Sequence, residues 1–323
     1  MNRLGLLLTI GLGGSPAHQA PPGTNPVLAG ADPHVVVLRD QVWLYPTHSG
    51  GGEPRFHAYS STDLRQWKDH GPVLRFADVK WINDDGERTH YAWAPALAER
   101  AGKFYFYFSV GPQGRTPARI GVAVGDRPQG PFRDSGRPLL TGGNGFEAID
   151  PMVFRDPLKG KHYFYAGGSA GAKLRIFEMN PDMVSFKKEI PVKTPPKFTE
   201  GPFVHFRRGT YYLTYSHGFW RDHTYSSYYA TSGTPYGPWR YGGPFLTGDS
   251  VHKGPGHHSI FRGPGADEWY IAYHRWNRAE GKGPYRGARQ VAIDRLEHGL
   301  GGVLRPVRMT DVVPAMSTGQ PRG

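Results

Sequence analysis

Three acidic residues stand in three similar stretches of this chain: Asp32 in ADPHV, Asp150 in AIDPMVF and Glu200 in TEGPFV. Cleavage of a glycosidic bond needs an acid that protonates the leaving oxygen and a second carboxylate on the other face of the sugar. When the second carboxylate activates water, the two groups lie about 6.5–9.5 Å apart. Asp-Pro pairs also begin turns for purely conformational reasons. The acids are therefore catalytic candidates only if the fold brings them together.

An internal repeat supplies such a fold. Five segments begin with a polar or small residue, usually next to proline, and continue through an apolar strand, a turn and an aromatic-rich strand. They start at Ala31, Trp93, Ile149, Glu200 and His257. A second pair of strands follows each segment, in a more divergent form after the fifth. Because two hairpins make one four-stranded blade, we predict an all-β fold, a five-bladed β-propeller around a central channel. A β-sandwich would not explain five matched units.

The innermost strand of each propeller blade starts near the central channel, so the first residues of the five segments are expected to face one axial pocket. The residues at these positions are Asp32, Trp93 with Ala94, Asp150, Glu200 and His257. Asp32 in blade one and Glu200 in blade four then face each other across the channel. We expect apolar neighbours and a nearby anion to keep Glu200 protonated, and Asp150 to act through its charge and hydrogen bonds.

Composition agrees with a β-rich enzyme. The 323 residues include 45 Gly, 30 Pro and 13% aromatic residues, and these residue types favour turns and pleated surfaces over helices. The net charge of +12 comes from scattered Lys and Arg rather than from a long basic block or a nucleic-acid-binding motif, so no nucleic-acid partner is expected. The absence of cysteine excludes disulfides and thiolate metal sites.

The chain is expected to fold as one domain. Residues 1–20 are interpreted as a signal peptide or a disordered N-terminus, 21–313 as the propeller and 314–323 as a flexible tail. One Arg precedes the short apolar run Leu4–Leu12, and Ser15-Pro16-Ala17 offers a cleavage site, which favours a signal peptide. The protein is then secreted or periplasmic, and no segment is long enough to span a membrane.

The order of motifs resembles glycoside hydrolase family 43, whose members are five-bladed propellers. The matching motifs are ADPHV, WAP, AIDPMVF, TEGPFV, GPGHHS and WYIAYHRW, which cover almost the whole predicted domain. The resemblance implies an inverting glycosidase with Asp32 as general base, Asp150 as the residue that modulates the pKa of the acid and orients it, and Glu200 as general acid. Ala96 departs from the pattern, because WAP is usually followed by an acidic residue in this family.

Further residues are expected to contact the sugar. Trp93 and Ala94 open blade two, where an aromatic face stacks on a sugar ring; Trp81, Phe219 and Trp220 are additional candidates. The resemblance implies that Arg289 reaches the sugar or Asp150. It also implies that His257 contacts the substrate or, through water, a calcium ion in the channel, whereas the adjacent His258 points away as a structural residue. Hydrolysis requires no cofactor.

Three functions remain open from the sequence. The first is removal of terminal arabinofuranosyl or xylosyl groups from plant-type polysaccharides or oligosaccharides by a monomeric enzyme. The second is endo-arabinanase activity, which needs an open groove. The third is a non-catalytic carbohydrate-binding propeller, which has no need of three acids. A retaining mechanism, as in related propeller families, would give the opposite product anomer.

Overall fold

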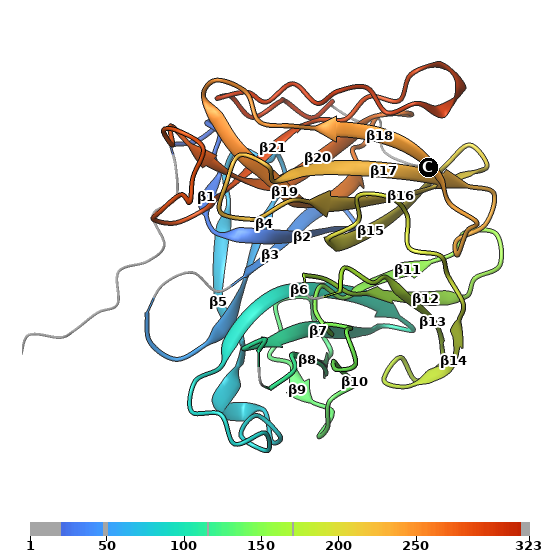
Figure 1. The fold of residues 1–323 in the computed structure, drawn as a ribbon. Coiled ribbons are helices and arrows are strands. Elements are labelled where there is room, and N and C mark those ends of the chain that lie inside the picture. The colour runs from blue at the N-terminus through green and yellow to red at the C-terminus, as the bar shows by residue number, and fades with distance from the viewer. Residues whose placement is uncertain (1–20, 48–50, 115, 170, 318–323) are drawn as a thin grey trace, which may run out of the picture.

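The computed structural model describes residues 21–47, 51–114, 116–169 and 171–317. Five antiparallel sheets are arranged in a ring, which confirms the predicted five-bladed propeller (Figure 1). Helical structure in these ranges is limited to the 3₁₀ turns η1 (Phe76–Asp78) and η2 (Leu300–Gly302). No helix there is long and apolar enough to cross a membrane. The expected signal peptide lies outside the described residues.

The first four blades each consist of strands that follow one another along the chain, with the innermost strand first. Blade one comprises β2 (Ala31–Leu38), β3 (Gln41–Thr47), β4 (Arg55–Ser61) and β5 (Lys68–Arg75). Blade two comprises β6 (Tyr91–Arg100), β7 (Lys103–Gly111), β8 (Arg119–Gly125), β9 (Arg133–Asp134) and β10 (Leu140–Thr141). Blade three comprises β11 (Met152–Arg155), β12 (His162–Ala166), β13 (Arg175–Met179) and β14 (Phe186–Ile190). Blade four comprises β15 (Glu200–Arg207), β16 (Thr210–His217), β17 (Ser226–Ser232) and β18 (Arg240–Leu246).

Blade five is built from both ends of the chain. Its inner strands are β19 (His252–Arg262), β20 (Trp269–Asn277) and β21 (Gln290–Arg295), and its outer strand is the N-terminal β1 (Leu28–Ala29). The prediction of a second hairpin after the fifth segment was therefore wrong: Leu28 pairs with Val291 in place of a strand from the C-terminal segment. This pairing joins the first and last blades and covers an edge that would otherwise be open.

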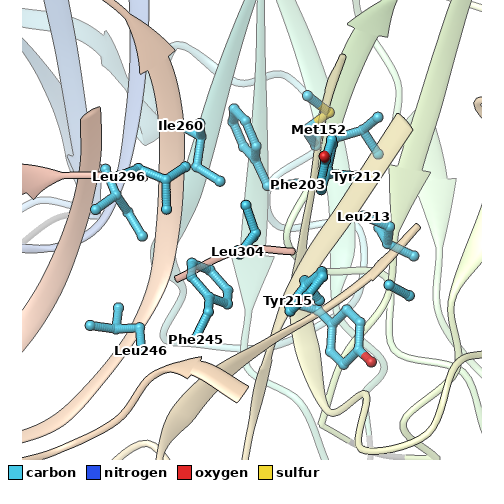
Figure 2. Packing of buried hydrophobic residues seen from close by; sticks show 14 of the residues in the cluster. Met152, Phe203, Tyr212, Leu213, Tyr215, Phe245, Leu246, Ile260, Leu296 and Leu304 are labelled. Carbon is cyan, nitrogen blue, oxygen red and sulfur yellow. The ribbon is translucent and has the colours of Figure 1, made fainter. Parts of the chain in front are cut away.

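Aromatic side chains fill the spaces between neighbouring blades. One cluster runs from β11 and β12 through blade four to blade five, and Figure 2 shows part of it, with Phe203, Tyr215 and Phe245 among the labelled residues. Tyr215 is fully buried, and its hydroxyl donates to the carbonyl of Pro196 at 2.8 Å. Large flat side chains are suited to these wedge-shaped gaps because they bury much area for little lost rotamer freedom. The high aromatic content thus serves packing between blades.

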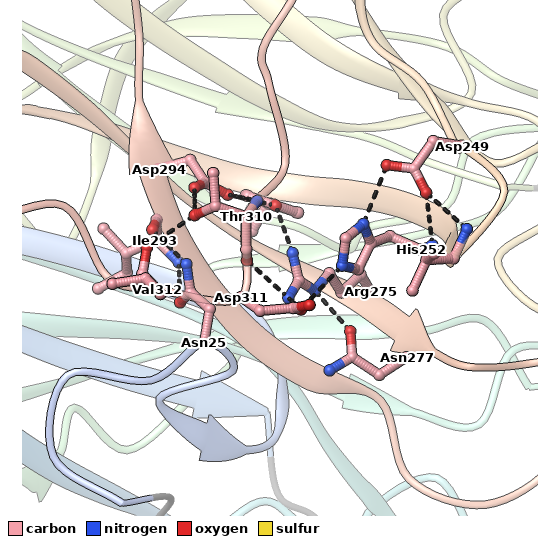
Figure 3. A network of polar contacts seen from close by, with 12 residues as sticks. Asn25, Asp249, His252, Arg275, Asn277, Ile293, Asp294, Thr310, Asp311 and Val312 are labelled. Atoms are coloured by element: carbon pink, nitrogen blue, oxygen red, sulfur yellow. Dashed lines mark hydrogen bonds and ion pairs between the residues drawn. The ribbon is translucent and has the colours of Figure 1, made fainter.

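A polar network holds the two ends of the chain against blade five (Figure 3). The side chain of Asn25 donates to the carbonyl of Ile293 at 2.7 Å and accepts from its amide at 3.0 Å. The fully buried Arg275 donates to the carbonyl of Thr310 at 2.9 Å and lies 3.3 Å from the carboxylate of Asp311. The backbone N–H of Asn25 in turn donates to the carbonyl of Asp311 at 3.0 Å. The closing strand and the C-terminal segment are therefore bonded to the same blade and to each other.

Part of the expected C-terminal tail lies within the described residues and contacts blade five. The side chain of Arg295 donates to the carbonyl of Ala315 at 2.6 Å. The amide of Ser317 donates to Glu268 at 3.1 Å, and the hydroxyl of Ser317 to the same carboxylate at 2.9 Å. The described end of the tail is thus bonded to blade five, while 318–323 lie outside the described residues.

Replacing Asn25 tests the importance of this closure. We expect Asn25→Ala to lower the free energy of unfolding by about 2–4 kcal/mol, because it leaves the buried amide and carbonyl of Ile293 without partners. Urea unfolding monitored by tryptophan fluorescence measures the change. The neighbouring Thr24→Ala, whose half-buried hydroxyl bonds only the carbonyl of Pro21, is the control and should cost below about 1 kcal/mol. Equal small losses for both variants would contradict the closing role of Asn25.

Candidate active site

Each inner strand contains a residue in the left-handed backbone conformation or, in blade three, follows one. These residues and their φ angles are Asp32 (46°), Ala94 (34°), Asp150 (59°), Gly201 (63°) and His257 (38°). The alignment of the five segments made from the sequence needs one correction, since Glu200 precedes the left-handed residue of blade four and Gly201 occupies the position of Asp32. Glu200 is thus equivalent to Trp93 rather than to Asp150. In blades one, two, four and five the pairing of the first two strands shifts register here.

The amide groups of these left-handed residues are bonded by the preceding blade. The acceptor is a side chain at the end of the second strand of that blade, so the bonds run around the ring. The pairs of amide and acceptor are Ala94 with Thr47 Oγ1 (2.7 Å), Asp150 with Ser109 Oγ (2.9 Å), His257 with Ser216 Oγ (2.8 Å) and Asp32 with His274 Nδ1 (3.2 Å). Burial lowers the pKa of His274 to about 4, so this ring is neutral and its nitrogen can accept.

Blade three departs from the pattern in a way that involves a candidate acid. The position equivalent to Ser109 is Gly167, where an added Cβ would lie 1.9 Å from the carbonyl oxygen of Lys173. No hydroxyl can therefore stand there. The amide of Gly201 donates instead to Oδ2 of Asp150 at 2.9 Å. Asp150 thus replaces the missing hydroxyl acceptor and holds the backbone directly after Glu200.

Asp32 is surrounded by donors and positive charge. Its Oδ1 accepts from Nη1 of Arg289 at 2.9 Å, and its Oδ2 accepts from the hydroxyl of Thr47 at 2.6 Å. The imidazole of His257 lies 3.6 Å from Oδ1. Burial alone would raise the pKa of Asp32, but the charge of Arg289, followed by that of His257, outweighs it and holds the pKa well below the ordinary value. The carboxylate is therefore ionised at neutral pH and able to accept a proton.

Asp150 has the opposite electrostatic setting. Burial, followed by the negative charges of Glu200 and Asp32, raises the pKa of Asp150 well above its ordinary value. Its bond to the amide of Gly201 and the charge of Arg289 offset this only in part. Asp32 and Asp150 thus have opposite electrostatic settings within one buried site: the pKa of Asp32 is lowered and that of Asp150 is raised.

Both oxygens of Glu200 are held by hydroxyl groups. Oε1 accepts from the hydroxyl of Tyr225 at 2.6 Å, and Oε2 accepts from the hydroxyl of Ser169 at 2.7 Å. Tyr225 is 1% exposed and belongs to blade four, whereas Ser169 is exposed and belongs to blade three. Glu200 as a whole is only 8% exposed, and its carboxyl group is fixed between the buried Tyr225 and the exposed Ser169.

His257 lies between two of the acids. Its Nδ1 is 3.6 Å from Asp32 and 3.5 Å from Asp150, and burial lowers its pKa. Calcium takes six to eight oxygen ligands, yet the oxygens of Asp32 and Glu200 already accept protein donors. Within the described ranges, no group of three or more His, Cys, Asp and Glu side chains is arranged to hold a metal. These residues do not form a protein cage for calcium, and a calcium ion held through water at His257 stays a prediction.

Comparison with known proteins supports a glycosidase. The sequence profile of the glycosyl hydrolases family 43 matches residues 23–303. A β-D-galactofuranosidase of Aspergillus niger is 34% identical over 88% of this chain and 85% of its own length, and a xylosidase/arabinosidase of Bacteroides ovatus is 31% identical over 78% and 87%. This chain belongs to glycosyl hydrolase family 43. It is a glycoside hydrolase that acts on carbohydrate.

Solved structures of the family have the same fold. A thermostable family 43 glycoside hydrolase superposes with a TM-score of 0.73 at 27% identity, over 90% of this chain and 97% of that chain. A family 43 enzyme of Xanthomonas citri, in complex with xylose, superposes with a TM-score of 0.70 at 29% identity, over 92% and 97%.

Aromatic residues border this family 43 site on two sides. Trp93 is half-buried and stacks on the exposed Tyr91 in blade two, with ring centroids 5.7 Å apart. Trp220 of blade four lies under the guanidinium of Arg289, 4.6 Å from the ring centroid, and is 36% exposed. Phe219 is 51% exposed next to it. These four aromatic side chains belong to loops or strand ends at the same end of the propeller as the acids.

Several residues singled out from the sequence do not serve as expected. Trp81 is buried at 2% exposure and bonds Asp134, so it packs between strands and offers no face to a sugar. Arg289 bonds Asp32 rather than Asp150. Ala94 contributes its backbone to the ring of bonds. His258, by contrast, is structural as expected from the sequence, since its ring nitrogens bond Ser227 and Thr214.

Six residues that matter to the site were missed. Thr47, Ser109, Ser216 and His274 occupy one position in the second strand of four repeats, so an alignment of these strands would have indicated them. Tyr225 and Ser169 lie in loops that carry no repeated pattern. Only the structure relates these two residues to Glu200.

A large cavity lies at the other end of the channel. It measures about 1420 Å³ and is lined by the far ends of the inner strands, including Val37, Arg155, Phe206 and Arg262. None of the three acids lines it, because they lie at the end of the channel where the inner strands start.

The charge of Arg289 generates a prediction for the pH dependence of activity. A group with a lowered pKa stays ionised to low pH, and removing its cation raises that pKa. We expect Arg289→Gln to move the acidic limb of the kcat/KM profile to higher pH, because Asp32 becomes protonated sooner as the pH falls. The control is Arg286→Gln, an exposed arginine of the same loop, which should leave the limb in place. An unmoved limb in Arg289→Gln would argue against Asp32 as the group that titrates there.

Proposed function

We propose that the protein is an exo-acting, inverting glycosidase that removes terminal arabinofuranosyl or xylosyl groups from plant-type polysaccharides or oligosaccharides. The observation that carries this proposal is the contrast between two carboxyl groups of one buried site. Asp32 is ion-paired with Arg289 at 2.9 Å, which suits a base. Glu200 is bonded only to hydroxyl groups on the two sides described above, which suits an acid that gains and loses a proton.

In the proposed reaction, water attacks the anomeric carbon while the bond from that carbon to the leaving oxygen breaks. Asp32 takes a proton from the water, and Glu200 gives its proton to the leaving oxygen. Asp150 acts on Glu200 in two ways. Its charge state changes the electrostatic potential at Glu200, and its bond to the amide of Gly201 keeps the backbone next to Glu200 in place.

The relatives support the sugar class of the proposal. Proteins named for xylosidase, arabinosidase or arabinofuranohydrolase activity match 76–94% of the chain, and a solved relative is described with bound xylose. An arabinan endo-1,5-α-L-arabinosidase also matches, over 58% of the chain. Endo-arabinanase action therefore remains the alternative. Secretion after removal of the N-terminal segment is part of the proposal as well.

Product analysis tests the substrate and the stereochemistry together. We expect release of arabinose or xylose from the aryl arabinofuranoside or xyloside, little action on linear arabinan, and an inverted anomer in the first NMR spectra. An aryl galactofuranoside belongs in the panel because one relative is a galactofuranosidase. A retained anomer would exclude the proposed mechanism, and short oligomers from arabinan would favour the endo alternative.

Two variants test the roles of the acids. We expect Glu200→Ala to reduce kcat by about 10²–10⁴-fold for poor leaving groups and far less for activated aryl leaving groups, which depart without a proton. Asp32→Ala should reduce kcat severely for every leaving group, since water activation is always needed, and azide should restore turnover as an inverted glycosyl azide. Glu297→Ala, at an exposed carboxylate, is the control. Equal losses on both leaving groups in Glu200→Ala would show that the acid is misassigned.

A further inference from the structure

Tyr225 is fixed against Glu200 by its packing. Its ring is parallel to that of His274, with an interplanar angle of 8° and centroids 5.5 Å apart. Its edge lies over Gly256, where an added Cβ would stand 2.4 Å from the ring. Gly256 is the blade-five equivalent of Glu200 and Trp93, so the missing side chain at this position is what admits the tyrosine. The hydroxyl can then reach Glu200 and little else.

The direction of the hydrogen bonds around Tyr225 is also determined. Burial, followed by the charges of Glu200 and Asp32, raises the pKa of Tyr225 well above its ordinary value, so the hydroxyl keeps its proton. The oxygen of Ser216 already accepts the amide proton of His257. Ser216 also lies beside the phenol and offsets part of this rise in the pKa of Tyr225. The proton of Tyr225 is therefore left for Oε1 of Glu200, at 2.6 Å.

We propose that Tyr225 is a positioning residue that makes Oε1 of Glu200 a permanent acceptor and so confines the catalytic proton to Oε2. This inference rests on the proposed role of Glu200 as general acid. Oε2 lies on the side of the exposed Ser169, from which a leaving-group oxygen can approach, whereas Oε1 faces the buried phenol. A proton on Oε1 would be unproductive, and the hydrogen bond from Tyr225 excludes it.

Removing the hydroxyl of Tyr225 leaves Oε1 buried without a donor. A buried acceptor without a partner is costly, so the carboxyl group then lowers its energy by carrying its proton on Oε1, away from the substrate. Binding of the sugar is unaffected because Tyr225 lies beneath the carboxylate. The loss should therefore appear in kcat rather than in KM, and only where protonation of the leaving oxygen limits the rate.

The test compares Tyr225→Phe with Tyr215→Phe. Both substitutions remove one buried hydroxyl of blade four, but that of Tyr215 bonds a backbone carbonyl away from the site. For Tyr225→Phe we expect kcat to fall about 10–100-fold with poor leaving groups and less than about 3-fold with activated aryl glycosides, at unchanged KM. Tyr215→Phe should lower both rates equally or not at all. Melting curves of both variants confirm that they are folded.

The outcomes separate this inference from the proposed function. If Glu200→Ala shows the leaving-group dependence and Tyr225→Phe does not, the positioning role is wrong while the acid assignment stands. If Ser169→Ala shows the dependence instead, the proton is controlled from the open side, which also overturns the inference. If Glu200→Ala itself lacks the dependence, the proposed function fails first.

Discussion

The hydrogen bonds to five left-handed amides hold the site together. A left-handed backbone costs a residue with a side chain roughly 1–2 kcal/mol, and Asp32, Ala94, Asp150 and His257 all adopt it. The bond that each amide donates contributes about 1 kcal/mol net, so the conformation persists only because the blades around it are firmly packed. Since each acceptor comes from the preceding blade, the packing of the blades also determines the geometry of the acids. A disturbance of any blade would reach the carboxylates.

This constraint explains how much of the site could be predicted from the sequence. Asp32 and Asp150 share a following proline, which marks the point where the inner strand leaves its ladder, and the repeat alone placed them at the axis. The sequence placed Glu200 in the correct pocket but aligned it with Asp32 and Asp150. The structure shows that Gly201, the residue after it, takes the left-handed position of those two residues. A pattern of residue types cannot distinguish a side chain at the left-handed position from one just before it. The backbone angles settle this.

Other features depend on contacts that no local pattern contains. The outer strand of blade five is Leu28–Ala29, some 260 residues from the strand it covers. The sequence pattern instead predicts this strand in the divergent segment after the fifth repeat. Tyr225 reaches Glu200 only because Gly256, on a different blade, has no side chain. The hydroxyl groups that bond Glu200 likewise come from Tyr225 and Ser169, which no pattern in the sequence relates to Glu200.

The residues that hold the three acids in place are largely distinct from those that border the sugar pocket. The ring of bonds and the charges around Asp32 fix the acids without any contribution from the rim. The rim consists of Tyr91 and Trp93 on one side and of Trp220 with Arg289 on the other. Arg289 belongs to both, since the guanidinium that holds Asp32 ionised also lies on the face of Trp220. A change of the loop around Trp220 would therefore alter the reach of the pocket and the charge of the base together. The two properties cannot be varied independently on that side, whereas the aromatic pair of blade two can change with less effect on the acids.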